Sequence, residues 1–262
     1  MRAAVIQMAS IPGDKAANFR LAESLLRQAA AGGARMAVLP ELWPTGFDIA
    51  RAAAYGETLQ AETGAFLRRL AKELALEIGG GSFIQAKQGK YYNTSMAVTA
   101  DGQLAAAYSK AHLFSYDMDE DQYLSAGDQW VAYDSPAAAL PVAMMICYDL
   151  RFPEFARNLA LRGSRLFTVP ACWPGKRIEE YRLFCRSRAA ENRCFLLSAN
   201  QCGAFGGHSL IASPFGEILA EGGEENQAVL ADLDFTLFAD PRLFGSFHDR
   251  RKRLDEIDDS LL

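Results

Sequence analysis

Three residues whose types suit nucleophilic chemistry each follow a short apolar run that is typical of a buried strand. They are Glu41, Lys110 and Cys147. Ligands of α/β sheets gather outside the carboxyl ends of the strands, so we expect the three side chains to share one edge of the fold. The runs that precede them span residues 36–39, 104–108 and 143–146.

Each of these residues alone is more simply explained by a structural role than by catalysis. A cysteine after an apolar strand is commonly a small buried hydrophobe, and single lysines and glutamates are commonly solvated. Together they make a coherent reaction, because a thiol attacks poorly until a base removes its proton. A neighbouring carboxylate can be that base. An ammonium beside both can stabilise the oxyanion that forms when a thiolate adds to a carbonyl or nitrile carbon.

The elements that must position these residues alternate between apolar runs and helical patterns along the whole chain. Apolar side chains recur at helical spacing in several segments, and β-branched or alternating runs separate them. The predicted helices span residues 16–30, 66–74, 153–161 and 179–192. The predicted strands span residues 3–8, 36–39, 77–84, 91–99, 104–108, 143–146, 166–169, 195–199, 208–212, 217–219 and 228–233.

Hairpin signals lie inside this series of strands. Gln88-Gly89 and Asp101-Gly102 connect consecutive strands, and Asp-Gly is a strong hairpin turn. Hairpins combined with helical crossovers imply mixed sheets, and about a dozen strands would split into two sheets. Helices outside two back-to-back sheets would bury every apolar strand face. We therefore expect one α/β domain over residues 1–262, with 235–262 as a C-terminal tail that packs on the domain or on a partner subunit.

Composition argues against several classes of function. The chain has 27 Lys and Arg against 32 Asp and Glu, and this net charge of −5 disfavours a nucleic-acid binder. No window approaches the roughly 18 apolar residues of a membrane span. The first residues are too short in apolar length for a signal peptide, so we expect no export signal. The five cysteines lack Cys-x-x-Cys spacing, and no histidine lies within five residues of one. We expect reduced thiols in a cytoplasmic protein, and no zinc site.

Three longer segments carry a family resemblance. They are VLPELWPTGF at residues 38–47, YSKAHLF at 108–114 and ICYDLRFPE at 146–154. In order and spacing they resemble the signature segments of the nitrilase superfamily, the carbon–nitrogen hydrolases, and the resemblance covers nearly the whole chain. It implies a four-layer α-β-β-α sandwich and subunits that form at least a homodimer.

The resemblance also implies a role for each chemical residue. Glu41 is expected to be the general base, Lys110 the stabiliser of the transition state and Cys147 the nucleophile. The backbone N–H of Tyr148 would share the oxyanion hole with Lys110. Glu120, in the loop after the lysine, matches a second glutamate that many members use. No metal or organic cofactor is implied, because the lysine and the Tyr148 N–H would supply what a metal supplies to an oxyanion.

Within the superfamily, residues 147–154, 171–174 and 188–192 resemble the bacterial ω-amidase group. Those enzymes deamidate 2-oxoglutaramate or 2-oxosuccinamate. Cys172 departs from the relatives, which often carry Asn or Glu at that position.

An ω-amide substrate of this kind carries a carboxylate far from the scissile amide, and a buried carboxylate needs a cation or several donors. Arg177 is the predicted partner of that carboxylate. Arg151 is expected instead to pair with Asp149 or Glu154. The residues predicted to form the apolar sides of the pocket are Trp43, Phe47 and Trp173.

Other functions use the same chemistry. An N-carbamoyl amine or amino-acid hydrolase, an aliphatic amidase and a true nitrilase would each need the same three residues, so the motifs do not separate them. A superfamily member recruited as a binding or assembly module would be favoured if one of the three were lost, and all three are present. A small-molecule amide is therefore the expected partner.

Overall fold

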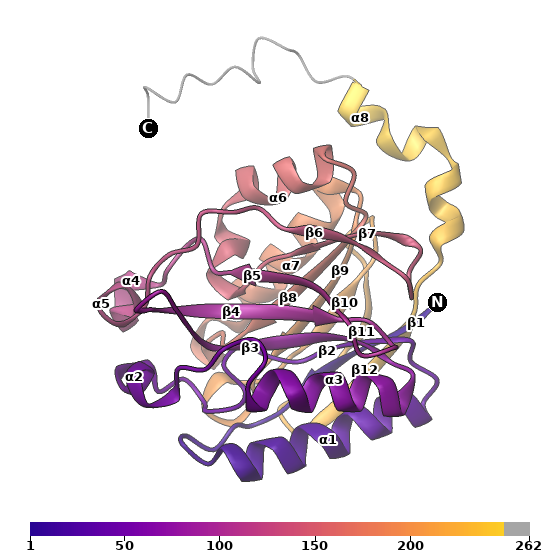
Figure 1. Cartoon of the computed structure of the whole chain (residues 1–262). Coiled ribbons are helices and arrows are strands. Elements are labelled where there is room, and N and C mark those ends of the chain that lie inside the picture. Colours follow the sequence, from indigo (N-terminus) through magenta and orange to yellow (C-terminus); the bar gives the residue numbers. More distant parts are fainter. Residues whose placement is uncertain (249–262) are drawn as a thin grey trace.

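Two six-stranded sheets lie face to face in the computed structural model, which describes residues 1–248 (Figure 1). Helices cover the outer face of each sheet, so the predicted four-layer arrangement is confirmed. The first sheet has the order β12 (Gln227–Asp232), β1 (Arg2–Gln7), β2 (Met36–Val38), β3 (Glu77–Lys87), β4 (Lys90–Val98) and β5 (Leu104–Ser109). The second has the order β11 (Ile218–Glu221), β10 (Leu210–Ala212), β9 (Phe195–Asn200), β8 (Leu166–Ala171), β7 (Leu140–Met144) and β6 (Ala132–Ser135).

Strand β1 shows why the central strands read as continuous apolar runs. Its alternate residues Ala3 and Val5 join the core between the sheets, whereas Ala4 and Ile6 pack under the helices of the first sheet. A strand covered on both faces has no solvated side and therefore loses the usual alternation of polar and apolar residues.

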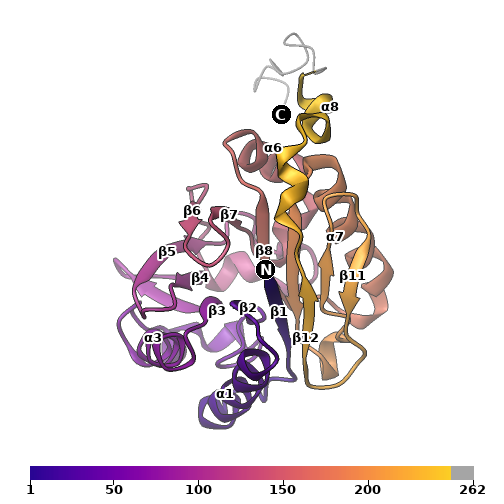
Figure 2. The same ribbon diagram turned by 90° about the vertical axis from the view of Figure 1, so that its right-hand side faces the viewer.

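Four longer helices form the outer layers, and Figure 2 shows two of them, α1 and α3, on the same side of the first sheet. Helices α6 and α7 belong to the second sheet, where α7 packs on β9 and β10. Shorter helical turns connect the strands. The α-helices are α1 (Lys15–Ala31), α2 (Ala52–Tyr55), α3 (Glu62–Leu74), α4 (Ser115–Met118), α5 (Glu120–Tyr123), α6 (Pro153–Leu161), α7 (Ile178–Asn192) and α8 (Gly245–His248).

Strand direction brings the sequence-predicted chemistry to one edge. Strands β1, β2 and β3 are parallel, and two successive antiparallel pairings make β5 run in the same direction as β3. In the second sheet β7, β8 and β9 are parallel. Glu41 and Lys110 therefore follow strands that point the same way, and Cys147 follows β7 across the sandwich.

Several short elements of the fold differ from the sequence-based expectation. Strand β6 and the short helices α2, α4 and α5 were not predicted, because segments of four residues carry too little periodicity to identify. The Gln88-Gly89 hairpin between β3 and β4 was predicted, and both of its residues have positive φ (52° and 74°). That geometry suits a two-residue hairpin turn.

The described part of the predicted tail contacts the second sheet. The Phe235 and Phe238 rings pack edge-on against Phe195 of β9, and the Arg165 guanidinium lies over the Phe244 ring. Residues 249–262, the remainder of that predicted tail, lie outside the described residues. None of the helices within residues 1–248 is long and apolar enough to cross a membrane.

Candidate active site

Glu41 lies three residues beyond β2 and is fully buried. Its backbone is held by the ends of strands in the opposite sheet. The Gln201 side chain donates to the Glu41 carbonyl oxygen (2.7 Å), and so does the Cys172 thiol (3.1 Å). The Cys172 backbone N–H donates to Oε2 of the Glu41 carboxylate (2.9 Å). Glu41 is thus fixed by both sheets.

A tight turn beside Glu41 depends on a glycine. Gly81 has a φ of 65° and lies in the irregularity of the β3–β4 ladder. A Cβ at this position would meet the Pro40 carbonyl oxygen at 2.2 Å and the Trp43 ring at 2.5 Å. Only glycine therefore lets the loop that carries Glu41 pack this closely on β3.

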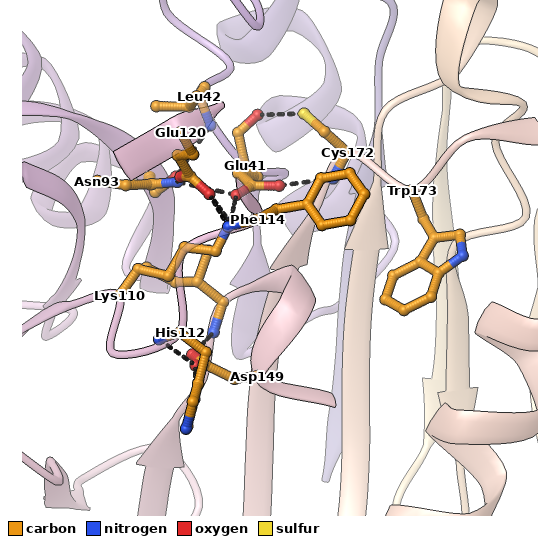
Figure 3. Close-up of polar contacts among 12 residues, drawn as sticks. Glu41, Leu42, Asn93, Lys110, His112, Phe114, Glu120, Asp149, Cys172 and Trp173 are labelled. Atoms are coloured by element: carbon orange, nitrogen blue, oxygen red, sulfur yellow. Dashed lines mark hydrogen bonds and ion pairs between the residues drawn. The ribbon is translucent and has the colours of Figure 1, made fainter. Parts of the chain in front are cut away.

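Lys110 follows β5 and directs its ammonium between two carboxylates (Figure 3). Its Nζ atom lies 2.8 Å from Oε1 of Glu41 and 2.8 Å from Oε2 of Glu120. All three side chains are at most 1% exposed. Asn93 on β4 donates from the same Nδ2 atom to Glu41 Oε1 (2.8 Å) and Glu120 Oε1 (3.1 Å). The two carboxylates are therefore bridged twice, by a cation and by an amide.

Cys147 begins a 3-10 turn, Cys147–Arg151, just after β7, and its φ of 45° is unusual for a residue with a side chain. Cys147 as a whole is 9% exposed, and it lines the same pocket as Glu41 and Lys110. The thiol interacts with the Glu41 carboxylate and with the backbone of Cys172. The structure thus brings the three predicted residues together.

A buried aspartate ties the lysine segment to the cysteine turn. Asp149 accepts hydrogen bonds from the Tyr108 hydroxyl (2.7 Å) and the Ile146 N–H (2.8 Å), and its other oxygen lies 2.7 Å from Nδ1 of His112. Tyr108 and His112 flank Lys110 in sequence. Asp149 therefore holds the position of Lys110 relative to the Cys147 turn.

Burial and charge set the ionisation of these groups. Burial raises the pKa of the Glu41 carboxyl, the Lys110 charge lowers it and the Glu120 charge raises it again, with a net rise. Burial lowers the pKa of Lys110, but the charges of Glu120 and Glu41 outweigh burial and raise it well above its usual range. Burial and the Glu41 charge raise the pKa of the Cys147 thiol. The site thus combines a stable ammonium with a protonated thiol that needs a base.

The pocket above these groups is lined by aromatic residues and by two arginines. Phe47, Trp173 and Arg177 line it as predicted from sequence, and Arg151 lines it as well. Both arginines also line a shallower recess that adjoins the pocket. The remaining lining residues are Glu41, Lys110, Phe114, Met118, Cys147, Tyr148, Cys172, Pro174 and Phe205.

Two of the pocket predictions are wrong. Trp43 does not line the pocket: it is fully buried under α1 and α3, where its indole N–H donates to the Gly80 carbonyl (2.8 Å). The left-handed backbone of Leu42 (φ 48°) redirects the chain between Glu41 and Trp43. Arg151 pairs with Glu180, in two hydrogen bonds of 2.7 and 2.8 Å, and not with Asp149 or Glu154.

Within the described residues, no group of three or more His, Cys, Asp or Glu side chains is arranged to hold a metal ion.

Comparison with known proteins identifies the family. The profile of the family described as Carbon-nitrogen hydrolase matches residues 2–240. The chain belongs to the carbon–nitrogen hydrolases. It is similar to the 2-oxoglutaramate amidase of Bacillus subtilis (37% identity, 83% of this chain and 85% of that protein). It is also similar to human omega-amidase NIT2 (34% identity, 92% of this chain and 91% of that protein).

A solved relative bears on the nucleophile of this carbon–nitrogen hydrolase. The chain resembles the amidase from Nesterenkonia sp. AN1, with a TM-score of 0.83, 26% identity, and coverage of 97% of this chain and 95% of that one. In that structure the acetamide moiety of fluoroacetamide is covalently attached to the active-site cysteine.

Two features of the site, Asn93 and the role of Asp149, were not predicted from the sequence. Asn93 is a buried polar residue in the middle of a strand, and an amide in that position is itself a signal. Asp149 was considered only as a local partner of Arg151. Its actual partners, Tyr108 and His112, are about forty positions away and no short-range pattern reveals them.

Proposed function

We propose that this chain is an ω-amidase, which converts 2-oxoglutaramate, or the shorter 2-oxosuccinamate, and water to the 2-oxo dicarboxylate and ammonia. One observation carries the proposal: a carboxylate, an ammonium and a thiol meet in a pocket that two arginines also line. The similarity to proteins named 2-oxoglutaramate amidase and omega-amidase supports the same substrate class.

The first half of the reaction forms a thioester. Glu41 takes the thiol proton as the Cys147 sulfur attacks the amide carbon. The Lys110 ammonium and the Tyr148 backbone N–H stabilise the resulting oxyanion. Glu41 then returns the proton to the amide nitrogen, the carbon–nitrogen bond breaks, and ammonia leaves.

The second half releases the acid. Glu41 takes a proton from water, and the hydroxyl attacks the thioester carbon. The same oxyanion site stabilises the second tetrahedral intermediate. The carbon–sulfur bond then breaks, and the Cys147 thiolate recovers the proton from Glu41.

Glu120 orients the groups that react. Its Oε2 atom accepts hydrogen bonds from the Lys110 ammonium (2.8 Å) and the Phe114 N–H (2.7 Å). Phe114 lines the pocket, so Glu120 links the position of the ammonium to the position of a pocket wall. We propose that it acts near the substrate nitrogen, chiefly in the transition state.

The two arginines of the pocket determine the substrate specificity in this proposal. We propose that Arg177 binds the substrate carboxylate, as predicted from the sequence. The Arg177 carbonyl accepts a hydrogen bond from the Trp173 indole (3.1 Å), which places this arginine beside an aromatic wall. Arg151 adds positive charge while its own guanidinium is held by Glu180. A substrate carboxylate bound here would exchange its hydrogen bonds to water for charge-assisted hydrogen bonds to the arginine.

A substrate panel tests the proposal. Released ammonia is measured with 2-oxoglutaramate, a neutral amide of the same length, an N-carbamoyl amine and the corresponding nitrile, using Cys147→Ala as the blank. We expect the highest kcat/KM for 2-oxoglutaramate, since a neutral amide cannot form the charge-assisted hydrogen bonds that the substrate carboxylate would make with Arg177. A higher kcat/KM for the neutral amide or the carbamoyl compound would reject the ω-amidase assignment and leave the thioester chemistry intact.

Two further expectations follow from the family resemblance, and a third, the cytoplasmic location, follows from the pattern of the cysteines. We propose that the chain forms a homodimer or a higher homo-oligomer, which analytical ultracentrifugation would measure. We also propose that it acts in the cytoplasm. No metal or organic cofactor is proposed, and dialysis against a chelator is expected to leave kcat unchanged; a loss of kcat that zinc restores would contradict this.

A further inference from the structure

The position of Asn93 in the β4–β5 ladder explains why its side chain lies beside that of Lys110. The Asn93 carbonyl accepts a hydrogen bond from the Lys110 N–H (2.8 Å), one step beyond the Thr94–Ser109 pair of the β4–β5 ladder. Residues directly opposite each other in an antiparallel ladder project their side chains to the same face. Asn93 and Lys110 are therefore fixed side by side, and both reach the same two carboxylates (Figure 3).

The charges decide which way the Asn93 amide is turned. Glu41 and Glu120 each accept a hydrogen bond from its NH₂ group, and an amide oxygen in that place would face two acceptors. With the NH₂ group so placed, the Oδ1 atom is buried and has no hydrogen-bond partner within residues 1–248. A buried acceptor without a partner is costly, so the bonds to the two carboxylates must outweigh that cost.

We propose that Asn93 is a positioning residue, which holds the Glu41 carboxylate ready to accept the thiol proton and keeps it apart from Glu120. The proposal rests on the proposed function, because it takes Glu41 as the base. At Glu120 the Lys110 ammonium and the Asn93 amide bond to different oxygens. At Glu41 both bond to Oε1, so Asn93 gives the oxygen held by the ammonium a second donor. Asn93 supplies a neutral donor that adds no proton and no charge to the reaction.

The effect of Asn93 on ionisation has a definite sign. Four ionisable groups interact with the Glu41 carboxyl in this site, namely Lys110, Glu120, Cys147 and Cys172. A hydrogen bond donated to a carboxylate favours its charged form and lowers its pKa. Removing the Asn93 donor therefore raises the pKa of Glu41. Because the base must be ionised, the acid limb of kcat/KM then moves to higher pH.

Two variants and a matched control test this role. Asn93→Leu keeps the approximate volume and removes the donor, whereas Asn93→Asp keeps the shape and adds a third carboxylate. Thr94→Val is the control: Thr94 is the next residue of β4, is equally buried, and bonds to Gln85 and Ser109 away from the site. The measurements are kcat, KM and the pH profile of kcat/KM, together with the melting temperature.

We expect Asn93→Leu to lower kcat about 10- to 100-fold, the usual effect of losing a hydrogen bond to a charged group, with KM changed much less. The acid limb should rise by about one pH unit. Asn93→Asp should shift the limb further in the same direction. Thr94→Val should leave the limb in place even if its melting temperature falls. The pH dependence of Cys147 alkylation by iodoacetamide should follow the same order.

An acid limb that stays in place or moves down in Asn93→Leu would overturn the proposal. If that variant does not fold, Asn93→Asp decides by the same criterion. Glu41→Gln separates this inference from the proposed function. If Glu41→Gln is inactive and the acid limb of the Asn93 variants is unchanged, only the role of Asn93 is rejected. Full activity of Glu41→Gln rejects Glu41 as the base and with it the role of Asn93, whereas the substrate panel decides the ω-amidase assignment.

Discussion

The two walls of the pocket differ in how their polar groups are paired. On the side of the first sheet, Glu41 and Lys110 line the pocket and Asn93 and Glu120 lie behind them. These four residues, which we call the first wall, are at most 1% exposed and bonded to one another at 2.8 to 3.1 Å. The wall from the second sheet carries Arg151, which is 24% exposed in its side chain, and its aromatic neighbours. We infer that the first wall performs the chemistry, because fixed buried charges need no rearrangement. We propose that the second wall selects the substrate.

Cys147 belongs to both regions. Its backbone continues β7 of the second sheet, while its thiol interacts with Glu41 of the first. The buried Asp149 joins the two walls behind it through Tyr108 and His112. Changes at Cys147 or in the first wall should therefore affect kcat, and changes in the second wall should affect KM and substrate preference.

The largest effect is expected from Cys147→Ala. The variant lacks the atom that bonds to the substrate, so kcat should fall on the order of 10⁴-fold or more. The melting temperature should change little, because only one sulfur atom is removed. Ammonia release is measured with 2-oxoglutaramate at saturation. Turnover in this variant close to that of the original chain would rule out the thioester route.

Glu120→Gln should have the next largest effect. It keeps the shape of the side chain but removes a charge that orients the Lys110 ammonium, and we expect kcat to fall about 100-fold with a smaller change in KM. The Glu120 charge raises the pKa of Glu41, so its removal lowers that pKa. The acid limb of kcat/KM should therefore move to lower pH, opposite to the Asn93 variants. A limb that moves to higher pH contradicts this account.

Arg177→Met tests the second wall. We expect kcat/KM for 2-oxoglutaramate to fall about 10- to 100-fold, mainly through KM, because a charge-assisted pair with the substrate is lost. Turnover of a neutral amide of equal length should change less than about twofold. Equal losses for both substrates would place Arg177 outside the carboxylate site.

Trp43→Phe should have the smallest effect on activity. The variant loses the hydrogen bond to Gly80 and part of the packing against Phe19 and Phe66. We expect a loss of about 1–2 kcal/mol in the free energy of unfolding, measured in urea, with kcat/KM within about twofold. A large change in KM without loss of stability would contradict this placement and indicate that Trp43 contacts the substrate.

The sequence predicted most of the first wall and less of the second. Glu41, Lys110 and Cys147 could be found because each follows an apolar run long enough to recognise as a strand, and parallel strands end at a common edge. The prediction for Trp43 was wrong because the left-handed backbone of Leu42 turns the Trp43 side chain away from the pocket. Leucine does not favour that conformation, so the sequence did not reveal it. The partner of Arg151 lies 29 residues away on α7, beyond local pairing rules.

Alkylation of Cys147 tests the central claim of covalent catalysis in this pocket most directly. The chain is treated with iodoacetamide, with and without 2-oxoglutaramate, and the modified peptides and remaining activity are followed together. The account predicts that one equivalent reacts at Cys147, that activity falls in proportion, and that 2-oxoglutaramate slows both. Loss of activity that follows modification of Cys172 or another cysteine, or turnover that persists after Cys147 is fully alkylated, would contradict it.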